Sequence, residues 1–192
     1  MSWRVRGLPN SGRTVGSYWW SADFQPRPAP AEGGLFKAAW FRSYDEVGRG
    51  AYMRGDGSFH SLDMLHRFVT VDLAVSTRTS ADFTGIATWG AAPDGALLLL
   101  DLVRKRMEGP DLVPAIARAV QLWNPMFVGI EKAGFQLGIV QEARRAGLPV
   151  RELVPDKDKF ARAVAATPAF EAGRVLFPRA APWRDELEAE LL

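Results

Sequence analysis

The sequence predicts an α/β fold in which a mixed five-stranded sheet carries helices on both faces. Three successive extended segments lie between residues 67 and 104, each rich in apolar and β-branched residues. After residue 110, apolar residues at helical spacing alternate with short extended segments, as in chains that build parallel crossovers. Hydrophobic residues make up 47% of the 192 residues, which is enough for one domain with a buried core.

The first three strands are predicted at residues 67–74, 84–90 and 96–104. Pro93-Asp94-Gly95 separates the last two and predicts a tight turn, because proline presets φ and glycine accepts a positive φ. A tight turn between adjacent strands makes a hairpin, so we expect these three strands to form an antiparallel meander.

The rest of the domain is predicted to alternate helices with strands. Asp111 is a candidate cap for an amphipathic helix, and Asn124-Pro125 ends that helix. The later elements are a strand at 126–131, a helix that ends at Gly147, a strand at 150–154, a helix at 157–166, an extended piece at 174–177 and a helix at 183–192. Strands that follow helices are expected to lie parallel in the sheet. This order of elements is that of the ribonuclease H-like fold.

Residues 1–60 are predicted to be irregular, because prolines and glycines interrupt them throughout. They are nevertheless too apolar for a free tail. The aromatic residues that argue for packing are Trp19, Trp20, Phe36, Trp40 and Phe41. We therefore expect residues 1–60 to be a linker or arm that packs on another surface, such as a preceding domain, and residues 61–192 to form the folded domain.

Composition excludes several classes of site. The chain has no cysteine, which excludes disulfides and thiolate metal sites and fits a reducing cytosol. It has two histidines, too few for a histidine-rich zinc site. No apolar run approaches the roughly 18 residues that a membrane span needs, and the N-terminus lacks the apolar core of a signal peptide. The net charge of +2 is too small to indicate nucleic-acid binding by itself.

Two carboxylates interrupt otherwise apolar strands. Asp72 lies in the first predicted strand, and Glu131 is the last residue of the fourth. Strands one and four are neighbours in the predicted order, so the two carboxylates would face each other and need a counter-charge. Mg²⁺ or Mn²⁺ suits such oxygen ligands, and two ions roughly 4 Å apart can activate water and stabilise the leaving oxygen of a phosphodiester. The alternative is that both carboxylates face solvent or pair with arginines, but their joint placement favours metal ligation.

Weaker candidates lie on either side of this pair. Asp82, between the first two strands, can bend back over the same metal site or cap its own turn, and both options stay open. Lys157, Lys159 and Arg162 open the helix after the fifth strand and are candidates for holding a DNA backbone, where affinity comes from phosphate charge. The alternative for these three is a solvated basic face.

Five segments in a fixed order carry a resemblance to a known family. They are residues 24–28 with 32–37, Val71-Asp72 with Asp82-Phe83-Thr84, Gly129-Ile130-Glu131, residues 158–163 and residues 171–175. The first resembles the linker that joins the ATPase and nuclease domains of phage terminase large subunits, the enzymes that package DNA. The others resemble the two acidic motifs and the downstream segments of the nuclease domain of that family.

The resemblance implies a metal-dependent endonuclease that cuts concatemeric double-stranded DNA around headful packaging. By matching position, Asp72 and Glu131 are the implied metal ligands and catalytic carboxylates, and Asp82 is a weaker candidate. Two ions, Mg²⁺ or Mn²⁺, are expected in the complete domain. The implied partners are double-stranded DNA, the portal and the small terminase subunit, and the implied location is the cytoplasm of the bacterial host.

Two departures from the family pattern qualify this expectation. There is no Gly-x-x-x-x-Gly-Lys-Ser/Thr phosphate loop, so we expect the ATPase domain to be lacking. The family carries a third acidic motif after a helix like the one predicted at 183–192, and the sequence stops at Leu192. We expect a nuclease domain that is weakened or inactive as this piece, because a two-metal site needs ligands for both ions.

Two alternatives stay open. Junction resolvases and transposases share the ribonuclease H-like order, although the linker segment at residues 24–37 argues against them. A non-catalytic module that docks on DNA or on the portal is favoured by the lack of the third acidic motif.

Overall fold

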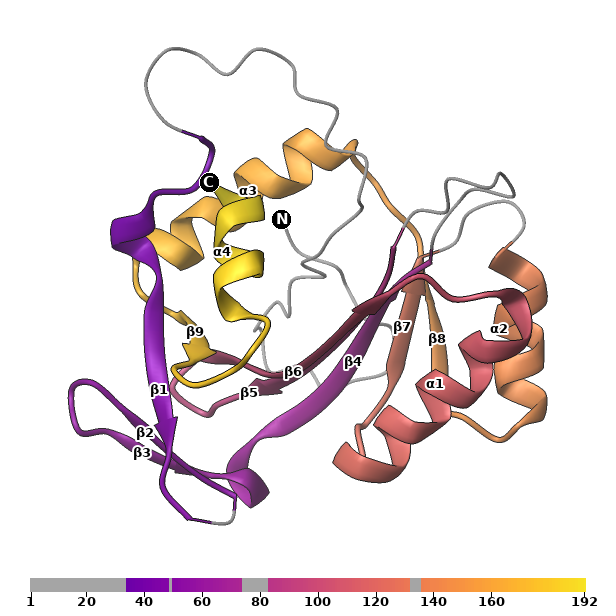
Figure 1. Ribbon diagram of the computed structural model, residues 1–192, viewed down its shortest axis with the longest axis horizontal. Coiled ribbons are helices and arrows are strands. Elements are labelled where there is room, and N and C mark those ends of the chain that lie inside the picture. The colour runs from indigo at the N-terminus through magenta and orange to yellow at the C-terminus, as the bar shows by residue number, and fades with distance from the viewer. Residues whose placement is uncertain (1–33, 49, 74–82, 132–135) are drawn as a thin grey trace.

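A single mixed sheet organises the computed structural model, which describes residues 34–48, 50–73, 83–131 and 136–192 (Figure 1). Its strands are β1 (Arg42–Glu46), β2 (Ala51–Arg54), β3 (Phe59–Ser61), β4 (His66–Asp72), β5 (Thr84–Ala91), β6 (Leu97–Lys105), β7 (Val128–Glu131), β8 (Val150–Leu153) and β9 (Val175–Pro178). Their order across the sheet is β3-β2-β1-β9-β6-β5-β4-β7-β8. The predicted α/β class is confirmed, but the sheet has nine strands among the described residues, where five were predicted.

The five predicted strands form one continuous half of this sheet, β6-β5-β4-β7-β8. β4, β5 and β6 are an antiparallel meander, and β7 and β8 add to β4 in parallel, as expected. Helices connect the parallel strands: α1 (Gly109–Trp123) precedes β7, and α2 (Gln136–Arg145) precedes β8. This arrangement matters for function because it places the C-terminal ends of β4 and β7 side by side.

Helices cover both faces of this half of the sheet. α1 and α2 pack on the face whose buried residues include Val69, Val71, Ile86, Val128 and Ile130. α3 (Lys159–Glu171) and α4 (Arg184–Leu191) pack on the opposite face, whose buried residues include Phe68, Trp89, Leu99, Phe127 and Phe177. Because the central strands are buried on both sides, their sequences read as continuous apolar runs rather than as alternating ones.

The largest difference from the predicted structure lies between residues 42 and 61. This segment was predicted to be irregular, yet it forms β1, β2 and β3. β1 joins the sheet by pairing in parallel with β9, with Ser43 opposite Phe177. That partner lies far away in the sequence, so no local pattern could predict the pairing. The glycines that suggested irregularity lie in the turns between strands, where Gly48, Gly50 and Gly57 have positive φ angles of 84°, 69° and 80°.

Residues before β1 pack on the same structure. Phe36 is buried and contacts Phe170, with the two ring centroids 4.7 Å apart. The ring centroids of Phe41 and Phe177 are 5.8 Å apart. Short 3-10 turns, η1 (Ala38–Trp40) and η2 (Leu62–Met64), flank the three added strands. Residues 1–33, which hold most of the linker resemblance, lie outside the described residues, and the division into an arm and a domain stays a prediction.

Two helix boundaries also differ from the prediction. α1 begins at Gly109 with Glu108 as its N-cap residue, so Asp111 lies in the first turn and the predicted cap at Asp111 is wrong. Its predicted end is confirmed, because Asn124 adopts a left-handed φ of 43°. α3 continues past residue 166 through Pro168. The Thr167 hydroxyl donates to the Val164 carbonyl oxygen (2.9 Å), which is the acceptor that proline, lacking an N–H, cannot reach.

Within the part of the chain that the structure describes, no helix is both long and apolar enough to cross a membrane.

Candidate metal and DNA site

One residue from each of four strands lies in a row at the end of the β-meander. Asp72 on β4 pairs with Gly85 on β5, and Gly85 pairs with Arg104 on β6. On the other side of β4, Val71 pairs with Ile130 of β7, so Asp72 and Glu131 are the next residues along both strands. Directly paired residues point to the same side of a sheet. The row therefore runs Glu131, Asp72, Gly85, Arg104.

The row faces α3 and α4. Val71 and Ile130 are buried in the cluster that packs against α1 and α2, so Asp72 and Glu131, their neighbours in sequence, point to the other side. This confirms one step of the sequence argument: the fold brings Asp72 and Glu131 to adjacent ends of parallel strands, on one face. Both residues are half-buried.

Glu131 forms an ion pair with an arginine. Arg162 of α3 donates from Nη1 to Oε2 of Glu131 at 2.7 Å. The side chains are 19% exposed for Arg162 and 32% exposed for Glu131, so the pair is partly screened by water. The guanidinium group of Arg162 is thus one counter-charge for this carboxylate.

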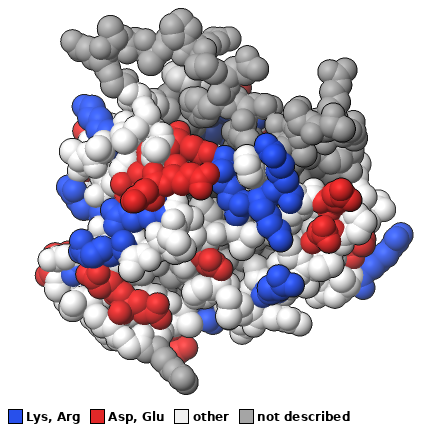
Figure 2. All heavy atoms as spheres, viewed as in Figure 1, with Lys and Arg blue, Asp and Glu red and all other residues white. Residues whose placement is uncertain are grey.

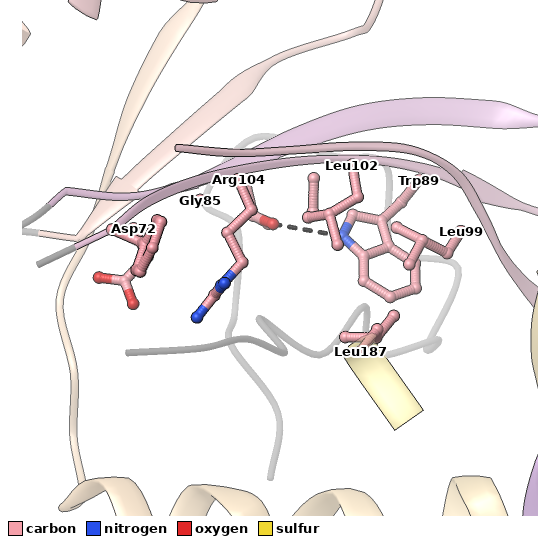
Figure 3. A pocket seen from close by; sticks show the side chains of 10 residues that line it. Asp72, Gly85, Trp89, Leu99, Leu102, Arg104 and Leu187 are labelled. Carbon is pink, nitrogen blue, oxygen red and sulfur yellow. Dashed lines mark hydrogen bonds between the residues drawn. The ribbon is translucent and has the colours of Figure 1, made fainter. Parts of the chain in front are cut away.

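Asp72 opens onto a pocket on the same face. Its lining includes Thr70, Phe83, Trp89, Leu102 and Arg104. Figure 3 shows the Asp72 and Arg104 side chains projecting from the sheet toward the same side, with Gly85 between them. A Cβ atom added at Gly85 would meet no heavy atom of the described residues within 4 Å. The missing side chain therefore leaves open space between the carboxylate and the guanidinium.

Arg104 ties α4 to the end of β6. It donates from Nη1 to Oε1 of Glu186 at 2.6 Å and pairs through Nη2 with Glu190. Its guanidinium also lies over the Phe83 ring, 4.0 Å from the centroid. Burial raises the pKa of Glu190, the Arg104 charge opposes this shift, and the Glu186 charge adds to it. α4 is therefore held beside the row by charge as well as by its buried Leu187.

The basic run Arg104-Lys105-Arg106 was not among the residues predicted from the sequence. Lys105 and Arg106 are exposed, and Arg106 lies 5.0 Å from the Phe83 ring centroid. Figure 2 shows acidic side chains gathered over α4 and, next to them, a cluster of basic side chains. Three consecutive basic residues at a strand end were a visible signal. The pairing of β6 with β5 and β4 places Arg104 in the row of Asp72, whereas Lys105, the next residue, points to the opposite face of the sheet.

The other predicted residues are placed as follows. Lys159 is the first residue of α3, Lys157 precedes it by two, and both are exposed. Asp82 lies outside the described residues. In the described ranges, no group of three or more His, Cys, Asp or Glu residues could hold a metal ion. The roles of Asp72 and Glu131 as ligands, and of Lys157, Lys159 and Arg162 on DNA, stay predictions.

Comparison with known proteins identifies a family. Residues 69–191, well over half of the chain, match the model of the terminase RNaseH-like domain. No curated protein sequence matches the chain.

Solved structures have the same fold. The large terminase nuclease from thermophilic phage G20c with bound magnesium has a TM-score of 0.54 and is 16% identical, with 82% of this chain and 80% of that chain covered. The same nuclease with bound zinc has a TM-score of 0.51 and is 17% identical, with 77% of this chain and 81% of that chain covered. The large terminase of a second thermophilic bacteriophage has a TM-score of 0.52 at 10% identity, with 79% of this chain but 34% of that chain covered.

Proposed function

Because the chain belongs to the terminase RNaseH-like domain family, we propose that it is the metal-dependent endonuclease domain of a phage DNA-packaging terminase large subunit. Its substrate is concatemeric double-stranded DNA, cut by two-metal hydrolysis of a phosphodiester. One observation carries the proposal: Asp72 and Glu131 end neighbouring parallel strands and point to the same face.

The residues at this place fit a divalent cation. Carboxylate oxygens are hard ligands of the kind that Mg²⁺ and Mn²⁺ prefer. Glu131 already binds a cationic group at 2.7 Å, which supports a local demand for positive charge. The related G20c nuclease has been solved with zinc, magnesium and cobalt bound. Ions held here would lower the pKa of bound water and neutralise charge on the leaving oxygen.

The chain's own residues would then bind and orient DNA. The space above Gly85 would admit a backbone phosphate next to Asp72, because no side chain from the part of the chain that the structure describes fills it. Lys157, Lys159 and Arg162 would hold the backbone from the side of α3. Arg106, which lies beside the Phe83 ring of the Asp72 pocket, would do so from the end of β6, so both sides of the carboxylate pair offer positive charge to phosphates.

The remaining parts of the proposal concern organisation and partners. Residues 1–60 are the arm and residues 61–192 the nuclease domain, with strands from the arm lengthening the sheet of the domain. Asp82 is a further, weaker candidate ligand. The proposed protein partners are the portal and the small terminase subunit, and the proposed location is the cytoplasm of the host bacterium.

The test is cleavage of supercoiled plasmid in Mn²⁺ by the wild type and by Asp72→Asn and Glu131→Gln. Asp63→Asn is the matched control, because Asp63 is exposed in η2, just before the opposite end of β4. We expect weak cutting by the wild type, because a two-metal site needs ligands for both ions, and we expect it to be lost in the first two variants and kept in the control. Cutting that survives both site substitutions would refute the assigned site. DNA binding without any cutting, even with an Asp-rich C-terminal extension added, would instead support the non-catalytic docking module, and a preference for branched DNA would support a resolvase-like nuclease.

A further inference from the structure

We propose that Arg162 is a latch that a metal ion releases. It neutralises Glu131 while no cation is bound, and it turns to a DNA phosphate once a divalent ion takes the carboxylate. The inference rests on the proposed function, because it assumes that Glu131 is a metal ligand. It adds a step to that function, since it makes one phosphate contact conditional on the metal.

The latch follows from the position of the ion pair. Nη1 of Arg162 lies 2.7 Å from Oε2 of Glu131, and Glu131 lies next to Asp72 at the end of the parallel pair β4 and β7. A guanidinium in this place occupies a carboxylate oxygen that a metal ion would need. Two cations at one carboxylate repel each other, so metal binding and the ion pair compete.

The backbone of Arg162 is fixed, so only its side chain can respond. The Asp158 carboxylate caps α3 by accepting the Ala161 N–H at 2.8 Å. One and two turns further on, Ala166 and Phe170 are buried in the core with 4% and 1% exposure. Release from Glu131 therefore reorients a flexible side chain on a rigid helix, and does not move the helix.

Once released from Glu131, the Arg162 side chain can bind a DNA phosphate. It extends from the first turn of α3, close in sequence to the exposed Lys157 and Lys159. An arginine fork binds phosphate oxygens in the same bidentate way as it binds a carboxylate. The exchange of Glu131 for a phosphate therefore couples the two ligands: metal raises the affinity for DNA, and DNA raises the affinity for metal by the same factor.

The first test is Mn²⁺ binding without DNA, by titration calorimetry, for the wild type, Arg162→Gln and Arg162→Lys. Arg144→Gln is the matched control, because Arg144 on α2 forms a similar pair with Glu152 of β8 at 2.9 Å. Ile130, the register partner of Glu152, faces α1 and α2, so the control pair lies on the opposite side of the sheet. Circular dichroism of each variant checks that it is folded.

We expect Arg162→Gln to bind Mn²⁺ about fivefold more tightly than the wild type, the size of one partly exposed ion pair. Arg162→Lys, which keeps the charge, and Arg144→Gln should bind like the wild type. Equal or weaker binding by Arg162→Gln would overturn the latch. If Glu131→Gln also leaves Mn²⁺ binding unchanged, the proposed metal site itself fails, which is a different result.

The second test is the salt dependence of DNA binding, in Ca²⁺ and in EDTA. In Ca²⁺, Arg162→Gln should reduce the slope of log K against log salt by about 0.9, the value for one phosphate contact. In EDTA the slopes of wild type and variant should agree, because Arg162 is then held by Glu131. A reduced slope under both conditions would show a contact that needs no release, and no reduction under either would show no contact. Either result overturns the latch.

Discussion

Replacing Gly85 with alanine should make this protein more stable, although the residue lies in the candidate site. Gly85 is in β5, its φ is not positive, and an added Cβ would meet no atom within 4 Å among the residues that the structure describes. A glycine in such a place loses excess backbone freedom on folding without any steric need for it. Alanine should therefore raise the free energy of unfolding by about 0.4–1 kcal/mol. For a chain of this length, that is a rise in Tm of roughly 1–4 °C.

Gly90 provides the matched control, because it lies in the same strand with the opposite surroundings. A Cβ at Gly90 would lie 2.7 Å from Cδ1 and 3.2 Å from Cβ of Leu65, and 3.3 Å from Cδ1 of Leu100. Gly90→Ala should therefore cost about 1–3 kcal/mol by overpacking. Urea denaturation of both variants with the wild type measures the difference. If Gly85→Ala is destabilised as much as Gly90→Ala, the open space at Gly85 does not exist.

A larger side chain at Gly85 should lower activity without lowering stability. Gly85→Val places a β-branched side chain between Asp72 and Arg104 and suits a central strand. We expect it to fold at least as stably as the wild type but to lose cutting by about a hundredfold, because a phosphate can no longer approach Asp72 closely. Plasmid cleavage measured at matched protein concentration tests this. Full activity in Gly85→Val would show that DNA does not use this space.

Two further predictions concern α4. Leu187 is 3% exposed and lines the pocket beside Trp89, so Leu187→Ala should cost about 2–5 kcal/mol and loosen α4 first. Amide hydrogen exchange that stays as slow in α4 as in the wild type would contradict this. Burial raises the pKa of Glu190 in the folded state, so protonation of Glu190 favours folding. This contribution to the free energy of unfolding is complete below the unfolded-state pKa of Glu190 and is lost as the pH rises through its folded-state pKa. In urea denaturation, the free energy of unfolding of Glu190→Gln should therefore rise relative to that of the wild type as the pH rises between these two pKa values. A fall in this difference over the same pH range would refute the shift.

The sequence by itself determined the central half of the fold. The apolar runs at β4, β5 and β6, the turn at Pro93-Asp94-Gly95 and the alternation of helices with strands after residue 110 are all local signals. Steric limits on φ and the side-chain periods of helices and strands act within a few residues, so they can be inferred from residues that are close in the sequence. The meeting of Asp72 and Glu131 also followed, because the order of elements leaves few ways to arrange such a sheet.

Only the tertiary structure decided the contacts between distant segments. β1 pairs with β9, Arg162 binds Glu131 from a helix 31 residues away, and Arg104 holds the carboxylates of α4. Each of these partners is chosen by which surfaces the packed core brings together, and many other arginine–carboxylate pairs would suit the same sequence equally well. The identity of the counter-charge at the candidate site is therefore a property of the folded chain, because charge pairing depends on distance in space and not on spacing along the sequence.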